Sequence, residues 1–275
     1  MFWNVDHMDK DDLKKLAKDP KYIPGIYNYC DRWCERCPFT SKCLNCTLVK
    51  EQFGDLEKID ELNEAFWRKF SEMLHSTLTM IKEMAKEQGL DLDSMDMEKN
   101  HNNDDPKIEN SLEHLISHTS KNYAKSVDQW FNSNEYLFFE KEAEVNRIRI
   151  ISSQRNPIQE AEGINDAVEI LRWYQWQIHV KLRRAVHSAT TEESLDFEEF
   201  PKDSDGSAKV ALIGIDRSMS AWKVLLTAFP GQAESIMSFI KILGHIKKGL
   251  ETQFPNARDF IRPGFDDNKE QGLSP

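Results

Sequence analysis

The cysteines are the strongest chemical signal in this chain, because all five lie within seventeen positions of a 275-residue sequence. Their spacing is C-x3-C-x2-C-x5-C-x2-C. Loops of two or three residues let neighbouring sulfurs turn toward one point, as a tetrahedral metal ion or an iron–sulfur cluster requires. The spacing predicts a cysteine-ligated metal centre, and its candidate ligands are Cys30, Cys34, Cys37, Cys43 and Cys46.

Basic and aromatic side chains are interleaved with these cysteines. Arg32, Arg36 and Lys42 bring positive charge that favours the thiolate, which is the form of cysteine that binds metal. Aromatic side chains would keep water away from a cluster and so tune its potential. The aromatic residues of the segment are Tyr27, Tyr29, Trp33 and Phe39. The segment therefore has the charge and the shielding of a metal site as well as the spacing.

Two kinds of centre suit the pattern, an iron–sulfur cluster and a structural zinc ion. The two Cys-x2-Cys pairs, 34/37 and 43/46, are typical of zinc, but the five residues between them are fewer than the usual zinc spacing of about twelve or more. Proline follows Cys37, as in ferredoxin-type runs. We predict a 4Fe–4S cluster and keep zinc as the alternative. The preferred ligands are Cys30, Cys34, Cys37 and Cys43, with Cys46 as the alternate.

A disulfide framework and a radical-SAM centre fit the cysteines less well. Disulfides need an oxidising compartment, and residues 1–18 carry acids and lysines without the apolar run of a secretion signal. An odd number of cysteines would also leave one sulfur unpaired. The spacing of Cys30, Cys34 and Cys37 matches the radical-SAM signature, but no alternation of strands and helices follows it. The sequence therefore does not predict a radical-SAM enzyme.

The composition indicates a water-soluble, cytoplasmic protein. Hydrophobic residues make up 39% of the chain and charged residues 30%, and no apolar run reaches the length of about eighteen residues that a membrane span needs. The net charge of -11 repels phosphate backbones, so we expect no nucleic-acid partner. A protein partner is compatible with the composition, and the oligomeric state is left open.

Hydrophobic periodicity predicts an all-α fold, a bundle of five to six helices that carries an N-terminal cysteine-rich metal-binding knot. Helices are expected over residues 56–88, 108–131, 135–154, 162–189, 205–229 and 232–254. The expected domains are a cysteine-rich arm (1–54), the bundle (55–254) with mobile acidic loops at 89–107 and 190–204, and a flexible tail (255–275).

Three polar residues fall on apolar faces of the predicted helices and form a possible buried polar site. Arg217 lies among apolar positions of the helix over 205–229, and a buried guanidinium needs a carboxylate. Glu169 shares an apolar face with two tryptophans and is the expected partner, while His179 lies between two apolar faces. A structural ion pair is the first interpretation of this set, and an anion or substrate site is the second.

These patterns support three functions. The first is a metal-binding protein whose iron–sulfur cluster serves electron transfer, redox sensing or a partner redox enzyme. The second is a zinc-stapled protein-interaction module. The third is a redox enzyme with a pocket inside the helical bundle, near Glu169, His179 and Arg217. Whether the chain has any catalytic activity is not specified by the sequence.

Overall fold

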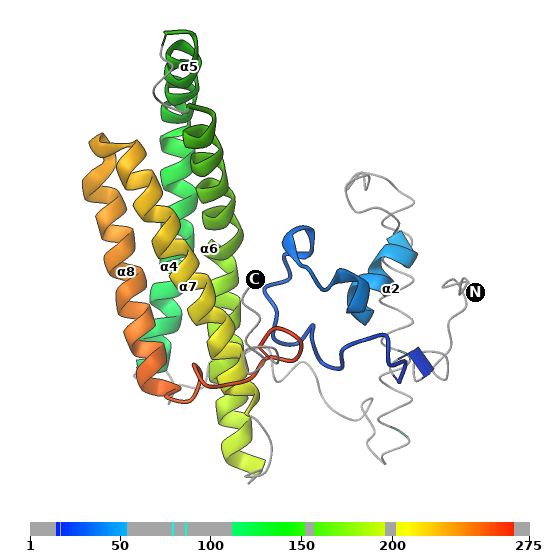
Figure 1. Cartoon of the computed structure of the whole chain (residues 1–275). Coiled ribbons are helices and arrows are strands. Elements are labelled where there is room, and N and C mark those ends of the chain that lie inside the picture. Colours follow the sequence, from blue (N-terminus) through cyan, green and yellow to red (C-terminus); the bar gives the residue numbers. More distant parts are fainter. Residues whose placement is uncertain are drawn as a thin grey trace. The chain divides into compact units, whose positions relative to one another are not determined.

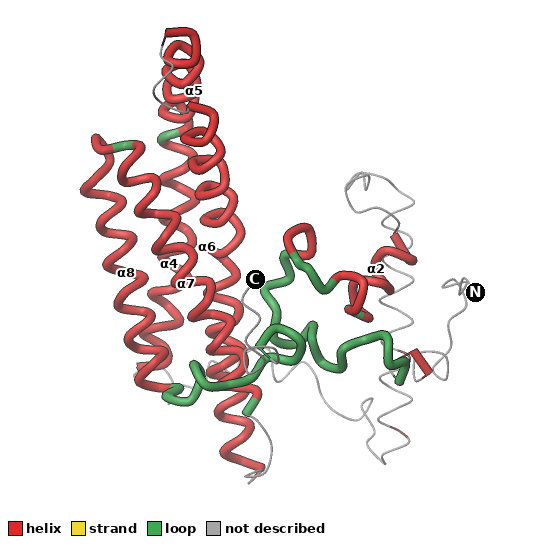
Figure 2. Tube along the Cα trace, viewed as in Figure 1, coloured by secondary structure: helices red, strands yellow, loops and turns green. Residues whose placement is uncertain are grey.

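Helices dominate the computed structural model, as the scarcity of glycine and proline predicts (Figure 2). The structure describes residues 15–16, 18–53, 79, 86, 112–151, 157–195 and 202–266, and over these residues it contains no strand. The chain divides into two units. Unit 1 comprises Met1–Asn28, Arg32–Asp105 and Pro263–Pro275, and unit 2 comprises Tyr29–Asp31 and Pro106–Arg262. The all-α prediction is confirmed for the described part of the chain.

Unit 2 is a helical bundle that runs up, down, up and down, and its first upward arm consists of two consecutive helices (Figure 1). Helix α4 continues upward into α5 in this view, α6 returns along both, and α7 and α8 complete the bundle. The helices are α4 (Leu112–Ser133), α5 (Glu135–Ile151), α6 (Pro157–Leu195), α7 (Asp203–Ala228) and α8 (Ala233–Gln253). None of the described helices is both long and apolar enough to cross a membrane.

Helix α7 is the most buried helix of the bundle, as its nearly continuous apolar circumference predicts. Small residues let α6 approach it closely. A Cβ atom placed on Gly214 would come within 2.8 Å of the Tyr174 ring, and one placed on Gly206 would overlap the Tyr29 ring. Glycine is therefore required at both positions by space.

An aromatic cluster fills the bundle at one level. Trp222 is fully buried, stacks on Phe239 at a centroid distance of 4.7 Å, and meets Trp130 edge-on at 5.2 Å. Its indole N–H donates to the Tyr123 hydroxyl at 3.0 Å. Burial raises the pKa of that Tyr123 hydroxyl, and the bonds from Trp222 and Ser218 offset only part of the increase. These rings pack on one another and form part of the core of unit 2.

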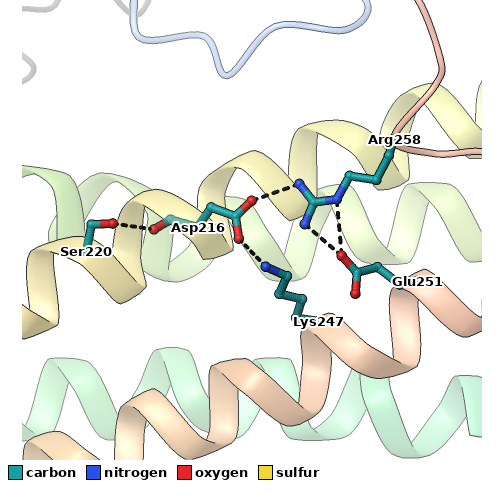
Figure 3. A network of polar contacts seen from close by, with 5 residues as sticks. All are labelled: Asp216, Ser220, Lys247, Glu251 and Arg258. Carbon is teal, nitrogen blue, oxygen red and sulfur yellow. Dashed lines mark hydrogen bonds and ion pairs between the residues drawn. The ribbon is translucent and has the colours of Figure 1, made fainter.

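The segment after α8 is held by ion pairs (Figure 3). Arg258 donates to Asp216 of α7 and to Glu251 of α8, each at 2.8 Å. Lys247 of α8 reaches the other oxygen of Asp216, also at 2.8 Å. Burial acts to raise the pKa of Asp216, but the bonds and charges of its two cationic partners outweigh it and lower that pKa. The network joins α7, α8 and the following turn.

The part of unit 1 that the structure describes consists mainly of short elements between Asp19 and Phe53. Its elements are the 3-10 turns η2 (Cys34–Arg36) and η3 (Thr40–Lys42) and the helix α2 (Leu44–Phe53). The Ile23 amide donates to the Lys42 carbonyl at 3.0 Å, which holds two loops together. Phe39 meets Phe265 edge-on at 5.0 Å.

The structure differs from the predicted boundaries at three places. Helix α6 runs on to Leu195, so the first six residues of the expected acidic loop 190–204 are helical. The last two, Asp203 and Ser204, already belong to α7. The expected flexible tail is packed as far as it is described: Ala257, Phe260 and Asp266 are buried. The predicted helix 56–88, apart from residues 79 and 86, and the predicted loop 89–107 lie outside the described residues.

Candidate functional site

Four of the five cysteines belong to unit 1 and lie at the ends of its short elements. Cys34 begins η2 and Cys37 ends it, Cys43 ends η3, and Cys46 lies in the first turn of α2. All four are thiols outside any disulfide, and Cys46 is the most buried. The two Cys-x2-Cys pairs are therefore each contained in a single turn of the backbone.

Two of the sulfurs accept backbone hydrogen bonds. The Phe39 amide donates to Sγ of Cys37 at 3.4 Å, and the Cys46 amide donates to Sγ of Cys43 at 3.5 Å. Backbone N–H groups placed in this way can serve as the outer hydrogen-bond shell of a metal-bound sulfur. Arg36 lies between Cys34 and Cys37 in sequence, and its guanidinium lies 4.2 Å from the centroid of the Trp33 ring.

The described residues do not form a coordination sphere for a metal ion. No group of three or more histidine, cysteine, aspartate or glutamate side chains lies close enough within the described part of the chain to hold a metal ion. The two pairs have the composition of a thiolate site, but their sulfurs are not gathered at one point. The metal centre predicted from spacing therefore remains a prediction.

Cys30 differs from the other four because it belongs to unit 2, between two residues that unit 2 holds firmly. The Tyr29 ring meets Phe260 edge-on at 4.6 Å, with the Arg184 guanidinium 5.9 Å from the ring centroid. Asp31 follows directly, and Arg32 after it adopts a left-handed backbone conformation with φ 58°. The first predicted ligand is thus separated from the other four by a residue in the left-handed conformation.

Asp31 is bound at both its carboxylate and its carbonyl. Oδ2 accepts from Arg217 Nη1 at 2.9 Å and from the Tyr174 hydroxyl in a short hydrogen bond. The Asp31 carbonyl oxygen accepts from Trp173 Nε1 at 3.0 Å and from Gln177 Nε2 at 2.6 Å. Four donors from α6 and α7 therefore converge on this one residue.

The tyrosine of this network is kept in its neutral form. Burial raises the pKa of the Tyr174 hydroxyl, and its hydrogen bond to the neighbouring Asp31 raises it further, while Arg217 opposes both effects only in part. A neutral phenol can donate to the carboxylate. We therefore interpret the group of Asp31, Tyr174 and Arg217 as an anchor for the chain that precedes Arg32.

The predicted burial of Arg217 and its predicted pairing with Glu169 are corrected by the structure. The Arg217 side chain is 53% exposed, and its ion pair is with Asp31. Glu169 is exposed on α6. The helical pattern placed Arg217 among apolar residues correctly, but the aliphatic part of an arginine can lie on such a face while the guanidinium reaches out to a partner.

His179 takes part in a different network, between α6 and α4. Its Nδ1 lies 2.9 Å from the Ser120 hydroxyl. Burial lowers the pKa of His179, and the charges of Arg183 and Lys121 lower it further. The described residues therefore do not bring Glu169, His179 and Arg217 together in one network, although all three belong to unit 2.

A shallow groove of about 360 Å³ lies between α6 and α7. Its polar residues include Asp166, Asp216 and Arg217, while Ala167, Ile170 and Val224 supply apolar walls. Asp216 forms ion pairs with Lys247 and Arg258. Arg217 forms an ion pair with Asp31. Because these charges already have partners within the fold, the groove offers no obvious catalytic group.

Sequence reasoning missed Asp31 and Tyr174. Tyr174 was visible as one of several aromatics on the helix, and Asp31 as an acid among the cysteines, but the two are 143 positions apart. Comparisons of this chain with protein-family models, with curated proteins and with solved structures find no match.

Proposed function

We propose that unit 1 is a cysteine-ligated metal module whose ligands are Cys34, Cys37, Cys43 and Cys46, and that it carries an iron–sulfur cluster for electron transfer or redox sensing. The observation that carries the proposal is the pair of backbone N–H···S hydrogen bonds, to Cys37 and to Cys43, one in each Cys-x2-Cys pair. Donors aimed at sulfur are the usual outer shell of a thiolate-bound centre and also tune its potential.

The small described core of unit 1 supports the same proposal. Only a few of its described apolar side chains are buried, and they are Leu16, Tyr22, Ile26, Trp33 and Cys46. Short segments with few buried apolar side chains are commonly stabilised by cross-links. The five cysteines form no disulfide, so a metal centre is the cross-link that the residues themselves offer.

A structural zinc ion is the second candidate. It is favoured by the division of the chain, because unit 1 contains both Cys-x2-Cys pairs while Cys30 belongs to unit 2. Two such pairs are a complete tetrahedral ligand set. In that case the module would serve as a folded surface for a protein partner and would carry no electrons.

Anaerobic purification of the full chain, followed by elemental analysis and absorbance spectroscopy, tests the proposal. We expect iron and sulfide bound in stoichiometric amounts and a band near ~400 nm that dithionite bleaches. The double variants C34S/C37S and C43S/C46S should lose the metal, and C30S is the matched control that should keep it.

The possible results are distinct. Stoichiometric zinc in a colourless protein would replace the cluster with the second candidate. Loss of metal in C30S would move the ligand set to the one that sequence spacing first favoured. A full-length chain that binds neither iron nor zinc, prepared anaerobically and loaded with each metal, would refute both candidates.

A further inference from the structure

A groove of about 320 Å³ in unit 1 is lined by basic and hydroxyl side chains. Its lining residues are Lys21, Thr40, Ser41, Thr47 and Lys50. Two are ammonium groups and three are hydroxyls, and none of these described lining residues is acidic. The volume is at the lower end of the range for small-molecule sites. No cysteine lines it, so the groove is separate from the sulfurs of the proposed metal centre.

Three stretches of the chain bring these groups together. The Ile23 amide bonds to the Lys42 carbonyl at 3.0 Å, which places the turn of Lys21 beside η3. Thr47 and Lys50 are three residues apart on α2 and share one face of that helix. The groove is therefore a product of the fold of unit 1 and not of adjacent residues in sequence.

Several of its donors are available to a ligand. Within the described part of the chain, the hydroxyls of Thr40 and Ser41 and the ammonium of Lys50 make no hydrogen bond or ion pair. Lys21 lies with its ammonium 5.1 Å from the Tyr22 ring centroid, and the nearby Asp19 carboxylate accepts from the Lys21 backbone amide. The Thr47 hydroxyl is engaged with the Cys43 carbonyl at 3.2 Å.

We infer that this groove binds the phosphate group of a small molecule. Two positive charges and two available hydroxyl donors match a doubly charged group with several acceptor oxygens better than they match a single carboxylate. The strongly acidic chain, at -11, disfavours an extended polyanion such as nucleic acid, so the ligand is a compact phosphate or phosphate monoester. This site is additional to the metal centre, but its residues lie in the segment that the proposed metal is expected to hold in place, so the titrations below use the metal-loaded chain.

Titration of the full chain with inorganic phosphate and with phenyl phosphate, followed by calorimetry, tests the inference. We expect both probes to bind, and the variant K21Q/K50Q to bind each at least about tenfold more weakly, because each lost charge-assisted bond contributes about a factor of ten. K42Q is the matched control: Lys42 is an exposed lysine of the same unit that does not line the groove.

A second variant keeps the test decisive. S41E places a carboxylate at an exposed position of the groove and should abolish binding without changing the circular dichroism spectrum. Equal weakening in K42Q and K21Q/K50Q would show that the probes only sense the general charge of the surface and would overturn the inference. Absence of phosphate binding by the unmodified chain would overturn it as well.

Discussion

The two units hold their conformation by different means. Unit 2 buries whole rings and aliphatic side chains along five helices, with Trp222, Tyr174 and Leu212 fully enclosed. The described residues of unit 1 form turns and one short helix, and Ile26 is the one apolar side chain there, apart from Cys46, that is less than 5% exposed. Bundle helices need only their apolar faces to pack, whereas short turns need cross-links.

The same contrast applies to their polar groups. In unit 2 the described charged networks include ion pairs that join helices, such as Arg184 with Asp203 at 2.6 Å. In unit 1 the described polar features are instead four thiols and a groove lined by lysine and hydroxyl side chains. Function is therefore expected in unit 1, and unit 2 is expected to respond to changes in its own packing and ion pairs. Four experiments test this difference.

Removal of the metal should have the largest effect and should be confined to unit 1. Structural zinc in small domains contributes about 10–16 kcal/mol to folding, and a comparable cross-link in unit 1 would decide whether residues 18–53 hold their conformation. A strong chelator should make the bonds after Lys21, Arg36 and Lys50 sensitive to trypsin, while the region from α4 to α8 resists. Mass spectrometry of the fragments measures this. Equal cleavage with and without chelator would remove the contrast between the units.

Truncation of Trp222 should give the next largest effect, in unit 2. The W222A variant loses a fully buried ring that contacts three aromatic neighbours, and such a loss costs about 3–5 kcal/mol. Urea denaturation monitored by circular dichroism at the helical band measures it. W222F is the control, since it keeps a ring and loses the hydrogen bond to Tyr123, at about 1 kcal/mol. Loss of metal from folded W222A would show that unit 1 depends on the bundle core.

Periodicity predicted much of unit 2 and little of its long-range pairing. The burial of α7 follows from its apolar circumference, which can be read from residues three and four apart. The partner of Arg217 could not be read in this way, because Asp31 is 186 positions earlier and lies in a segment without helical pattern. Local patterns identify which face is buried but do not identify which distant residue meets it.

The segment after the last helix was also predicted poorly, because local composition does not show which of its side chains are buried by distant residues. Residues 255–262 contain proline, asparagine and two arginines, which is typical of a tail, yet Ala257 and Phe260 are buried in unit 2. A single aromatic residue at the right place outweighs a polar composition. In unit 1 the spacing of the cysteines identified the candidate ligands, but it gave no indication that Cys30 belongs to the other unit.

Removal of the Asp31 carboxylate should destabilise unit 2 by a smaller amount. D31A leaves the carbonyl bonds from Trp173 and Gln177 in place and removes the acceptor of Tyr174 and Arg217. Because Arg217 is half exposed, we expect a loss of about 1–2 kcal/mol in urea denaturation.

The control for D31A is D259A, which removes an exposed aspartate of the same unit whose side chain has no described partner. The metal content of D31A should be unchanged, because the proposed ligands belong to unit 1. A fall in metal content without a fall in stability would show that Asp31 serves the metal centre and that the separation of the two units by function is wrong.

The smallest effect expected is a change in acid sensitivity at Asp203. Burial acts to raise the pKa of this carboxyl, but hydrogen bonds from Ser188 and Arg184, together with the charge of Arg184, lower that pKa below its ordinary value. The unfolded chain therefore takes up the proton first as the pH falls, so the contribution of Asp203 to stability is full above about pH 4 and is lost as the pH falls through the lowered pKa. D203N should flatten this part of the curve of unfolding free energy against pH, measured by urea denaturation, and D259N should leave it unchanged. If D203N and the unmodified chain lose stability in parallel below about pH 4, the ion pair with Arg184 does not stabilise the end of α6 against α7, and packing alone holds unit 2 together there.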